Sequence, residues 1–291
     1  MPTDQEIIAN WYASVYDQCE TGTDDVEFLL KVLGPDPLRV LEAACGTGRI
    51  LVPLARAGHD AAGFDMNEAM LARIAAKAAG LENIAWHVAD ALAQPWGGDY
   101  DVVVLAGNVL FNIETGGDYR EAQRLLLRRA YDALRPGGHI YLDFDCHPRP
   151  ARMFRPRKTQ RVVFAGTDSA GTHGTYSLMP GGGYDKAART AYGPRRTEVT
   201  TREGRKIVQE SVSRKRVLAL KVVLAWLEEL GFTPEQVWGG YDGKPAGRRA
   251  GRAIIYAKKG STNHEQLPTH SKVRPGMDRG QLDGPEPAVA P

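Results

Sequence analysis

Apolar and polar positions follow strand and helix periods in alternation along most of this chain. Short, almost wholly apolar runs, typical of strands buried on both faces of a parallel sheet, start at positions 40, 61, 83, 100 and 139. Between them, apolar residues recur at helical spacing over 49–57, 68–79 and 118–135. This alternation predicts an α/β fold with a doubly wound, mostly parallel sheet.

The two ends of this pattern extend the fold. Over 7–17 the apolar residues share one helical face, on which Trp11 is expected simply to pack. Over 218–230 a strongly apolar helix precedes strands at 232–237 and 253–257. This order of helix, strand, loop and antiparallel strand predicts a seven-stranded sheet, and it separates the fold from that of a dehydrogenase, whose last strand is parallel.

Charge is unevenly distributed over the chain. Residues 147–221 contain 17 Lys and Arg against 5 Asp and Glu, a net +12, although the whole chain carries +2. Short alternating runs at 160–164, 196–200 and 206–217 are separated by turn residues. They predict a small antiparallel β insertion over 149–217. Its charge fits a solvated sheet face, an anionic acceptor or RNA.

Composition sets further bounds. With 43% hydrophobic and 25% charged residues, the 291-residue chain is ordinary globular protein. It has no apolar run near the ~20 residues of a membrane span and no signal peptide at its start, so we expect a cytoplasmic protein without a membrane partner. Its 3 cysteines include no C-x-x-C pair, so neither a disulfide framework nor a metal site is expected. Residues 260–291, rich in proline and glycine, are expected to be a disordered tail.

The strongest chemical signal is the segment 42–48, which reads Glu-Ala-Ala-Cys-Gly-Thr-Gly and leads from a strand into a helix. Gly46 and Gly48 let the backbone bend and approach a ligand, and the helix start offers free N–H groups, so the segment predicts a nucleotide-cofactor loop. Leu51 stands where a dinucleotide loop needs its third glycine, which counts against NAD and FAD. Glu42 would repel a pyrophosphate but suits an ammonium or a sulfonium group. S-adenosylmethionine (SAM) carries both.

Polar residues follow the strands that should lie beside this loop. Asp65 ends the second strand 19 residues after Gly46, a spacing at which a carboxylate can accept both ribose hydroxyls. Asp90 follows the third strand, where it can accept from the adenine amine while the Ala91 N–H reaches a ring nitrogen. Asn108 follows the central strand and is either a turn former or a contact near the methionine end or the acceptor.

A second polar group follows the strand over 139–144, which delivers Asp145 and His147 to the same edge of the sheet as Asn108. A base or an acceptor clamp would lie in such a cluster, so Asn108, Asp145 and His147 are the candidate catalytic residues. The alternative is that Asp145 and His147 only shape the exit into the insertion. His59, in an Ala-Gly-His-Asp turn far from the strand tips, is expected to be an exposed loop residue.

In these segments and in their order, the chain resembles the class I SAM-dependent methyltransferases. Within that family it is similar to the small-molecule branch, which includes glycine and sarcosine N-methyltransferases and natural-product enzymes. The resemblance covers about residues 7–258. Besides the glycine loop and the two aspartates, it is carried by Leu-Arg-Pro-Gly-Gly at 134–138 and by Gly-Gly-Tyr-Asp-Gly-Lys-Pro at 239–245, which resembles the family's closing loop.

The resemblance implies a division of the chain and roles for several residues. Residues 1–36 would form lid helices, 37–148 with 218–259 the SAM-binding core, 149–217 a basic roof over the acceptor pocket, and 260–291 the tail. Tyr12 and Tyr16 would cover the cofactor and Met66 would pack on adenine, while Tyr184, Asp185 and Arg216 resemble recurrent positions of the roof. The expected cofactor-binding residues are Tyr12, Tyr16, Glu42, Ala44, Gly46, Gly48, Asp65, Met66, Asp90, Ala91 and Ala106.

The function that follows is transfer of a methyl group from SAM to a nitrogen or oxygen of a small molecule by in-line displacement. The expected partner is a small-molecule acceptor, and an anionic acceptor is one option. The protein is expected to be a monomer or a homodimer. The first alternative is an RNA or protein methyltransferase that uses the basic insertion. It is disfavoured because the chain has no recognisable RNA-binding module, and 106–111 reads Ala-Gly-Asn-Val-Leu-Phe instead of an aromatic Asn-Pro-Pro-Tyr-like tetrad. The second alternative is a non-catalytic SAM-binding protein, and the intact glycine loop argues against it.

Overall fold

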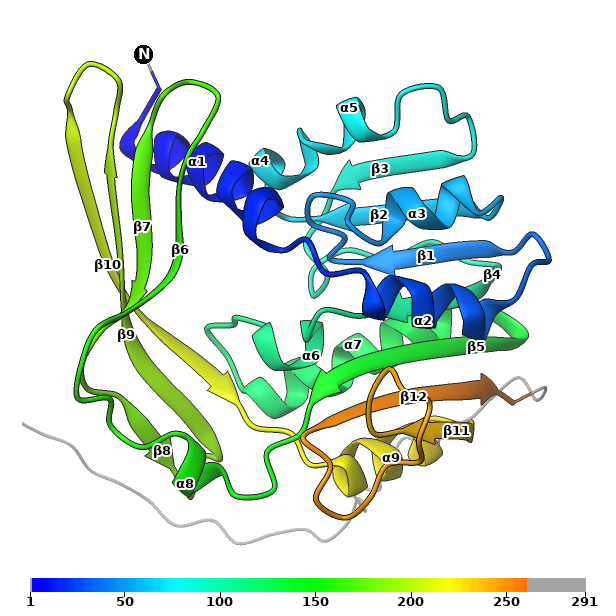
Figure 1. Ribbon diagram of the computed structural model, residues 1–291. Coiled ribbons are helices and arrows are strands. Elements are labelled where there is room, and N and C mark those ends of the chain that lie inside the picture. The colour runs from blue at the N-terminus through cyan, green and yellow to red at the C-terminus, as the bar shows by residue number, and fades with distance from the viewer. Residues whose placement is uncertain (1, 261–291) are drawn as a thin grey trace, which may run out of the picture. The chain divides into compact units, whose positions relative to one another are not determined.

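The main element of the fold is a seven-stranded sheet with strand order β11-β12-β5-β4-β1-β2-β3 (Figure 1). The computed structural model describes residues 2–260, so the predicted tail lies, from 261 on, outside the described residues. The strands are β1 (Arg39–Ala43), β2 (Asp60–Asp65), β3 (Ile84–Val88), β4 (Tyr100–Leu105), β5 (Leu134–Asp145), β11 (Phe232–Trp238) and β12 (Arg252–Lys259). The pairs among β1 to β5 are parallel, whereas β12 is antiparallel to both β5 and β11. The predicted sheet is confirmed, including its antiparallel last strand.

Helices cover both faces of this sheet because its central strands are apolar on both. Along β4, Val103 and Leu105 belong to one buried cluster, and Val102 and Val104 to the other, as the alternation of a strand requires. The first cluster includes residues of α7 (Tyr119–Ala133) and α9 (Leu220–Glu229). The second includes residues of α2 (Asp24–Leu33) and α3 (Leu51–Arg56).

The crossover from β2 to β3 differs from its prediction. Instead of one helix over 68–79, it contains the short helices α4 (Glu68–Leu71) and α5 (Ile74–Lys77). Between them the Arg73 N–H donates to the Met70 carbonyl, a bond to the third preceding residue that tightens the turn and interrupts the α-helical ladder.

His59, expected to be exposed, is buried, so that prediction is wrong. The Leu38 N–H donates to its Nδ1 at 3.3 Å, and Asn83 Nδ2 donates to its carbonyl at 2.7 Å. The turn between α3 and β2 therefore uses His59 to satisfy neighbouring backbone and side-chain groups, which local sequence could not reveal.

The insertion is an antiparallel sheet with order β10-β9-β7-β6, and β8 pairs with β9. Its strands are β6 (Arg161–Thr167), β7 (His173–Leu178), β8 (Gly183–Asp185), β9 (Thr190–Thr200) and β10 (Lys206–Arg216). The sequence predicted β6, β10 and the second half of β9, but it missed β7. That strand has few apolar residues and forms because β6 and β9 both pair with its backbone.

Helix α1 (Asp4–Cys19) contacts the inserted sheet and the crossover between β2 and β3 (Figure 1). Its apolar face, which includes the fully buried Trp11, packs on residues of β6, β9 and β10, and Trp11 Nε1 donates to the Gly166 carbonyl at 3.0 Å. At its other end, Asp17 accepts from Arg73 Nε at 2.7 Å and Lys77 Nζ at 2.9 Å. Trp11 packs as predicted, and α1 ties the inserted sheet to the β2–β3 crossover.

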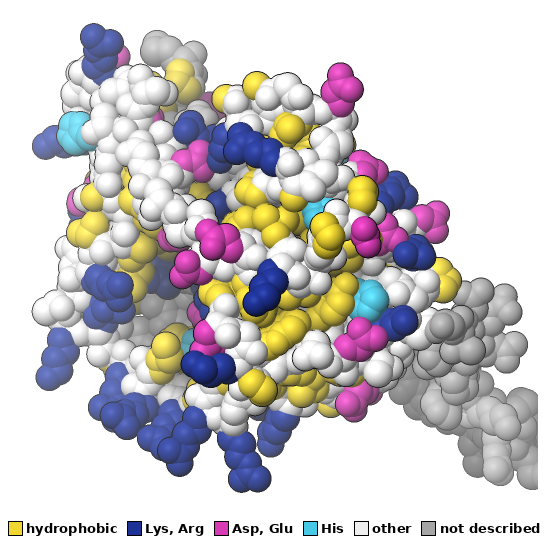
Figure 2. All heavy atoms as spheres, turned by 45° about the vertical axis from the view of Figure 1, so that its right-hand side comes forward, with side chains coloured by type: hydrophobic (Ala, Val, Ile, Leu, Met, Phe, Trp, Pro, Cys, Tyr) yellow, Lys and Arg dark blue, Asp and Glu magenta, His cyan; other side chains and the backbone are white. Residues whose placement is uncertain are grey.

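Basic side chains are concentrated on one part of the surface. In Figure 2 lysines and arginines gather at the lower left of the face shown, whereas acidic side chains are dispersed. Over residues 2–260, no helix has the length and apolar character needed to cross a membrane.

Candidate active site

The glycine loop leaves β1 with three residues in the left-handed region. Ala44 has φ 57°, Gly46 φ 55° and Gly48 φ 76°. A Cβ on Gly48 would lie 3.0 Å from Ile74 Cγ1, whereas one on Gly46 would meet nothing within 4 Å. Gly48 is thus required by packing as well as by φ, while Gly46 borders open space where a ligand can approach. The strained φ of Ala44, a residue with a Cβ, is of a kind that recurs at functional sites.

Asp65 lies at the tip of β2, as predicted, and it also holds the glycine loop. Its Oδ2 accepts from the Gly46 N–H at 3.0 Å and its Oδ1 accepts from the Asn67 N–H at 2.8 Å. Each carboxylate oxygen can accept more than one hydrogen bond, so Asp65 retains capacity for hydroxyl donors. The bond to the loop is a role that the sequence did not reveal.

Glu42 is buried below the loop, with its side chain only partly satisfied. The residue is 5% exposed, and its Oε2 has no hydrogen-bond partner among residues 2–260. Burial raises the pKa of the Glu42 carboxyl well above its usual value, an effect that the charge of Arg49 partly offsets. A buried carboxylate with an unpartnered oxygen is stabilised by a cationic group, so this position fits an ammonium or sulfonium ligand.

Arg49, which the sequence did not single out, anchors the loop to helix α2. It forms a bidentate pair with Asp25, with Nη1 to Oδ1 at 2.7 Å and Nη2 to Oδ2 at 2.5 Å. Burial raises the pKa of the Tyr16 phenol, and Arg49 beside it opposes that rise, which places Tyr16 next to the loop. Tyr12 instead packs edge-on against Phe164 and Tyr176, with ring centroids 5.5 and 5.4 Å away. Tyr12 and Tyr16, the two tyrosines expected to cover the cofactor, therefore face different neighbours.

The expected adenine-binding residues lie at the ends of β2 and β3. Met66 is 73% exposed, which leaves its side chain available to pack on a ligand. Asp90 is exposed too, and its Oδ1 accepts from the Leu92 N–H at 2.8 Å. The Ala89 N–H donates to the Asp65 carbonyl at 3.0 Å, which joins the two strand ends. These residues lie along one edge of the sheet, as the strand-end argument required.

At the same edge, Asn108 and Asp145 contact each other. Asn108 Nδ2 donates to Asp145 Oδ2 at 3.1 Å, and the Asp145 N–H donates to Asn108 Oδ1 at 2.6 Å. Asn108 has φ 66° and caps the one-turn helix α6 (Val109–Asn112). Both readings of Asn108 therefore have support, since it shapes the turn and lies at the rim.

Arg252 at this rim was not anticipated, whereas the closing loop that contains Tyr241 was expected to return to it. Arg252 Nη2 lies 3.1 Å from Asp145 Oδ1, and its Nη1 donates to Asp143 Oδ1 at 2.6 Å. The hydroxyl of Tyr241, in the predicted closing loop, donates to Asp143 Oδ2 at 2.6 Å. Because Arg252 and Asn108 both bind Asp145, this carboxylate is held in place and is suited to orienting a ligand.

His147 follows Asp145 by two residues and lies in an aromatic stack. Its ring is 4.9 Å from those of both Phe111 and Phe154, the residue is 6% exposed, and its Nδ1 has no hydrogen-bond partner among the residues described. Burial lowers its pKa, and the charge of Asp145 partly opposes this. The imidazole is therefore neutral near pH 7 and able to accept a proton. Within residues 2–260, no cluster of three or more His, Cys, Asp or Glu is placed to hold a metal ion.

Comparison with known proteins finds a family match for part of the chain. A family profile described as "Methyltransferase domain" matches residues 40–138, which run from β1 into β5. YqeM of Bacillus subtilis (strain 168), whose name marks its methyltransferase assignment as provisional, is 28% identical over 151 residues. The match covers 51% of this chain and 60% of YqeM, so the chain spans about three fifths of that relative's length.

Solved structures show the same fold over most of the chain. The CcbJ methyltransferase from Streptomyces caelestis superposes with a TM-score of 0.64 at 20% identity, covering 87% of this chain and 98% of CcbJ. SAM-bound CalS10, an amino pentose methyltransferase from Micromonospora echinaspora, superposes with a TM-score of 0.54 at 18% identity, covering 84% and 92%. At these identities the likeness concerns the fold, and its coverage is much larger than the span 40–138 of the profile match.

Proposed function

We infer that this chain, whose residues 40–138 match the methyltransferase-domain profile, is a SAM-dependent methyltransferase that acts on a nitrogen or oxygen of a small molecule. The observation that carries the proposal is the buried Glu42 carboxylate with its unpartnered oxygen below the glycine loop. Glu42 would bind the cationic methionine end, Asp65 the ribose, and Asp90 with Ala91 the adenine. The residues proposed to surround the cofactor are Tyr12, Tyr16, Ala44, Gly46, Gly48, Met66 and Ala106. When bound, SAM supplies a methyl group on a sulfonium, which is open to direct nucleophilic attack.

The residues of the chain contribute mainly by positioning. Asn108 and Asp145 offer a hydrogen-bond donor and acceptor at the rim, where they can orient the acceptor for in-line attack. Helix α1 and the inserted sheet would cover the acceptor and exclude water. An amine acceptor must lose a proton before it attacks, and the neutral imidazole of His147 can take that proton.

Nitrogen is the favoured acceptor atom within this proposal. A neutral, buried imidazole suits removal of a proton from an ammonium group, and the similar CalS10 is named as an amino pentose methyltransferase. A phenol or other acidic hydroxyl would be the second option, since it needs less help from a base.

Two measurements on the full chain test this proposal. Saturating SAM or S-adenosylhomocysteine should raise the unfolding midpoint, since a ligand at 100 times its Kd adds about 2.7 kcal/mol, whereas NAD should have no effect. An unfolding midpoint that rises with NAD but with neither SAM compound would contradict the assignment of SAM as the cofactor. Labelled methyl from SAM should then enter a metabolite extract and not total RNA. Label recovered in RNA at physiological salt would support the RNA alternative, which the basic insertion alone favours.

A further inference from the structure

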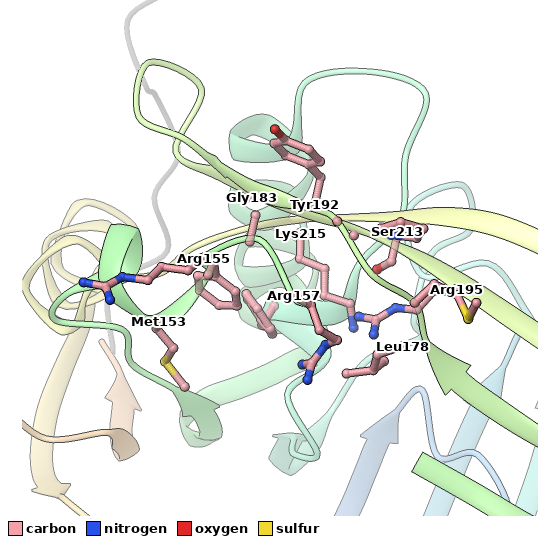
Figure 3. A pocket seen from close by; sticks show the side chains of 16 residues that line it. Met153, Arg155, Arg157, Leu178, Gly183, Tyr192, Arg195, Ser213 and Lys215 are labelled. Carbon is pink, nitrogen blue, oxygen red and sulfur yellow. The ribbon is translucent and has the colours of Figure 1, made fainter. Parts of the chain in front are cut away.

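A hollow of about 200 Å³ lies between the inserted sheet and the segment that leads into it (Figure 3). Gly193 of β9 and Ser213 of β10 face each other in register and both line it. A Cβ on Gly193 would meet nothing within 4 Å, so the small residues at these two positions leave the space open.

Three cationic side chains converge on this hollow. Arg157, Arg195 and Lys215 all line it, and Figure 3 shows the head groups of Arg195 and Lys215 beside each other, with that of Arg157 below them and Arg155 pointing away. Arg195 is paired with Ser211 and Lys215 with Ala191, so the two side chains come from opposite sides of the Gly193–Ser213 pair. The lining residues include no Asp or Glu.

These cations are not part of a structural ion-pair network. Within residues 2–260, Arg157, Arg195 and Lys215 form no salt bridge, and Arg195 Nε is buried without a hydrogen-bond partner. The adjacent Arg196, on the other face of β9, pairs with Glu198 at 2.6 Å and with Glu210 at 3.6 Å. Arg196 on the outer face is thus paired with carboxylates, whereas the three cations that line the hollow are not.

The environment of Lys215 reflects this imbalance. Burial, reinforced by the charge of Arg195, lowers the pKa of Lys215 to about 8, and Glu114 opposes the change only weakly. Lys215 Nζ donates to Asn112 Oδ1 and lies 5.5 Å from the centroid of the Phe111 ring. An oxyanion in the hollow would relieve the repulsion between Lys215 and Arg195.

The hollow adjoins the rim of the proposed active site. Phe111, which lines it, lies 4.9 Å from the His147 ring, and Phe111 and Asn112 belong to the one-turn helix that Asn108 caps. A ligand group in the hollow is therefore joined to the Asn108–Asp145 pair through a single helical turn.

We propose that Arg157, Arg195 and Lys215 bind a phosphate group of the methyl acceptor, which is therefore a phosphate ester. Phosphate suits three convergent cations better than a carboxylate does, because it carries up to two negative charges and its oxygens match the two guanidinium forks. The assignment of this phosphate to the acceptor rests on the proposed function, whereas the anion site itself does not.

The test is calorimetric binding of inorganic phosphate and pyrophosphate to the full chain, with NaCl added to keep the ionic strength constant. Arg195→Gln and Lys215→Met should each weaken binding about tenfold or more. Gly193→Val fills part of the hollow without changing its charge and should weaken phosphate binding to a similar extent. The matched control Arg214→Gln removes a charge next to Lys215 on the outer face of β10 and should change affinity less than about twofold.

Unchanged affinity in the three pocket variants, or an equal loss in Arg214→Gln, would overturn the proposal. S-adenosylhomocysteine binding by the same variants reports whether they are folded, because its proposed site is separate. If phosphate binds as expected but S-adenosylhomocysteine does not bind the parent protein, the anion site stands and the proposed function fails.

A 12-nucleotide single-stranded RNA serves as the third probe. Tight RNA binding that Arg214→Gln weakens as much as Lys215→Met would replace the phosphate site by a nucleic-acid surface.

Discussion

Asn108 and Asp145 form two hydrogen bonds with each other although they are 37 positions apart in the chain. One follows β4 and the other ends β5, so these reciprocal bonds close the edge of the sheet where two parallel strands end. The Asn108 N–H also donates to the Asp143 carbonyl at 3.3 Å. The turn after β4 is therefore fixed by side-chain and backbone bonds to β5 before any ligand is present.

This relationship predicts different effects for two truncations of Asn108. Asn108→Gly removes both side-chain bonds and should lower the free energy of unfolding by roughly 2 kcal/mol. Asn108→Ala removes the same bonds and also places a Cβ at φ 66°, which should cost about 1 kcal/mol more. Urea unfolding of the two variants measures the difference. Equal stability of the glycine and alanine variants would show that the left-handed backbone adds no strain.

A second prediction concerns Asp65. Asp65→Asn keeps one acceptor oxygen for the loop but removes the charge proposed to bind the ribose hydroxyls. The binding free energy of S-adenosylhomocysteine should therefore become less favourable by about 1.5–3 kcal/mol. Asp60→Asn, at the exposed start of the same strand, is the matched control and should leave affinity unchanged. Calorimetry distinguishes the two. An unaltered affinity in Asp65→Asn would place the ribose elsewhere.

Glu42 predicts a pH dependence of stability. The pKa of the Glu42 carboxyl in the folded protein is raised above the usual 4.5. At a pH between 4.5 and this raised pKa, the folded state therefore holds a proton that the unfolded state has released. The contribution of Glu42 is therefore largest at low pH, and stability should fall as pH rises through 4.5 toward the folded pKa. Glu42→Gln should remove this fall while weakening SAM binding. Urea unfolding of the parent protein and of Glu42→Gln between pH 5 and 8 measures this fall in stability. A stability difference between these two proteins that does not vary with pH would contradict the prediction.

The sequence predicted those parts of the site that depend on local pattern. The strand over 100–105 was located by its unbroken apolar run, and the glycine loop by residue types within seven positions. Asn108 and Asp145 were brought to the same edge by one general rule, because the carboxyl ends of parallel strands share an edge. These inferences need no knowledge of which residues meet across the fold.

The remaining contacts depend on long-range register and could not be predicted. Arg252 binds Asp145 because the two residues pair directly across the antiparallel strands β12 and β5, a register that no local pattern specifies. In the same way, Arg195 and Lys215 reach one hollow only because β9 and β10 pair through Gly193 and Ser213. The charge of the insertion was visible in the sequence, but which of its cations pair with carboxylates, as Arg196 does, and which line the hollow was not.

His147 gives a prediction for the pH dependence of methyl transfer. Burial lowers its pKa below 6.5, so the imidazole is neutral at pH 7 and the rate should fall only when pH drops below that lowered value. His147→Phe keeps an aromatic ring in the stack but removes the base, which should reduce kcat by about 100-fold or more and abolish the acidic limb of the profile. His139→Phe is the control, because His139 lies within β5, where its ring stacks on that of Tyr256 at 4.4 Å, whereas His147 follows the end of the strand. An acidic limb that persists in His147→Phe would assign the proton transfer to another group.

Lys215 should reduce the stability of the free protein. Its pKa falls from the usual 10.5 to about 8 on folding, so the folded state gives up a proton more readily than the unfolded state. By linkage, stability should rise as pH increases from about 8 to 10.5, and the charged form costs up to about 3 kcal/mol below pH 8. Lys215→Met should therefore be more stable than the parent protein at pH 7, with the difference shrinking toward pH 10.5. Saturating inorganic phosphate should narrow the same difference at pH 7, because it would stabilise only the protein that retains the cation. Urea unfolding with and without phosphate measures both effects, and a methionine variant that is less stable at pH 7 would show that the bond to Asn112 outweighs the burial of the charge.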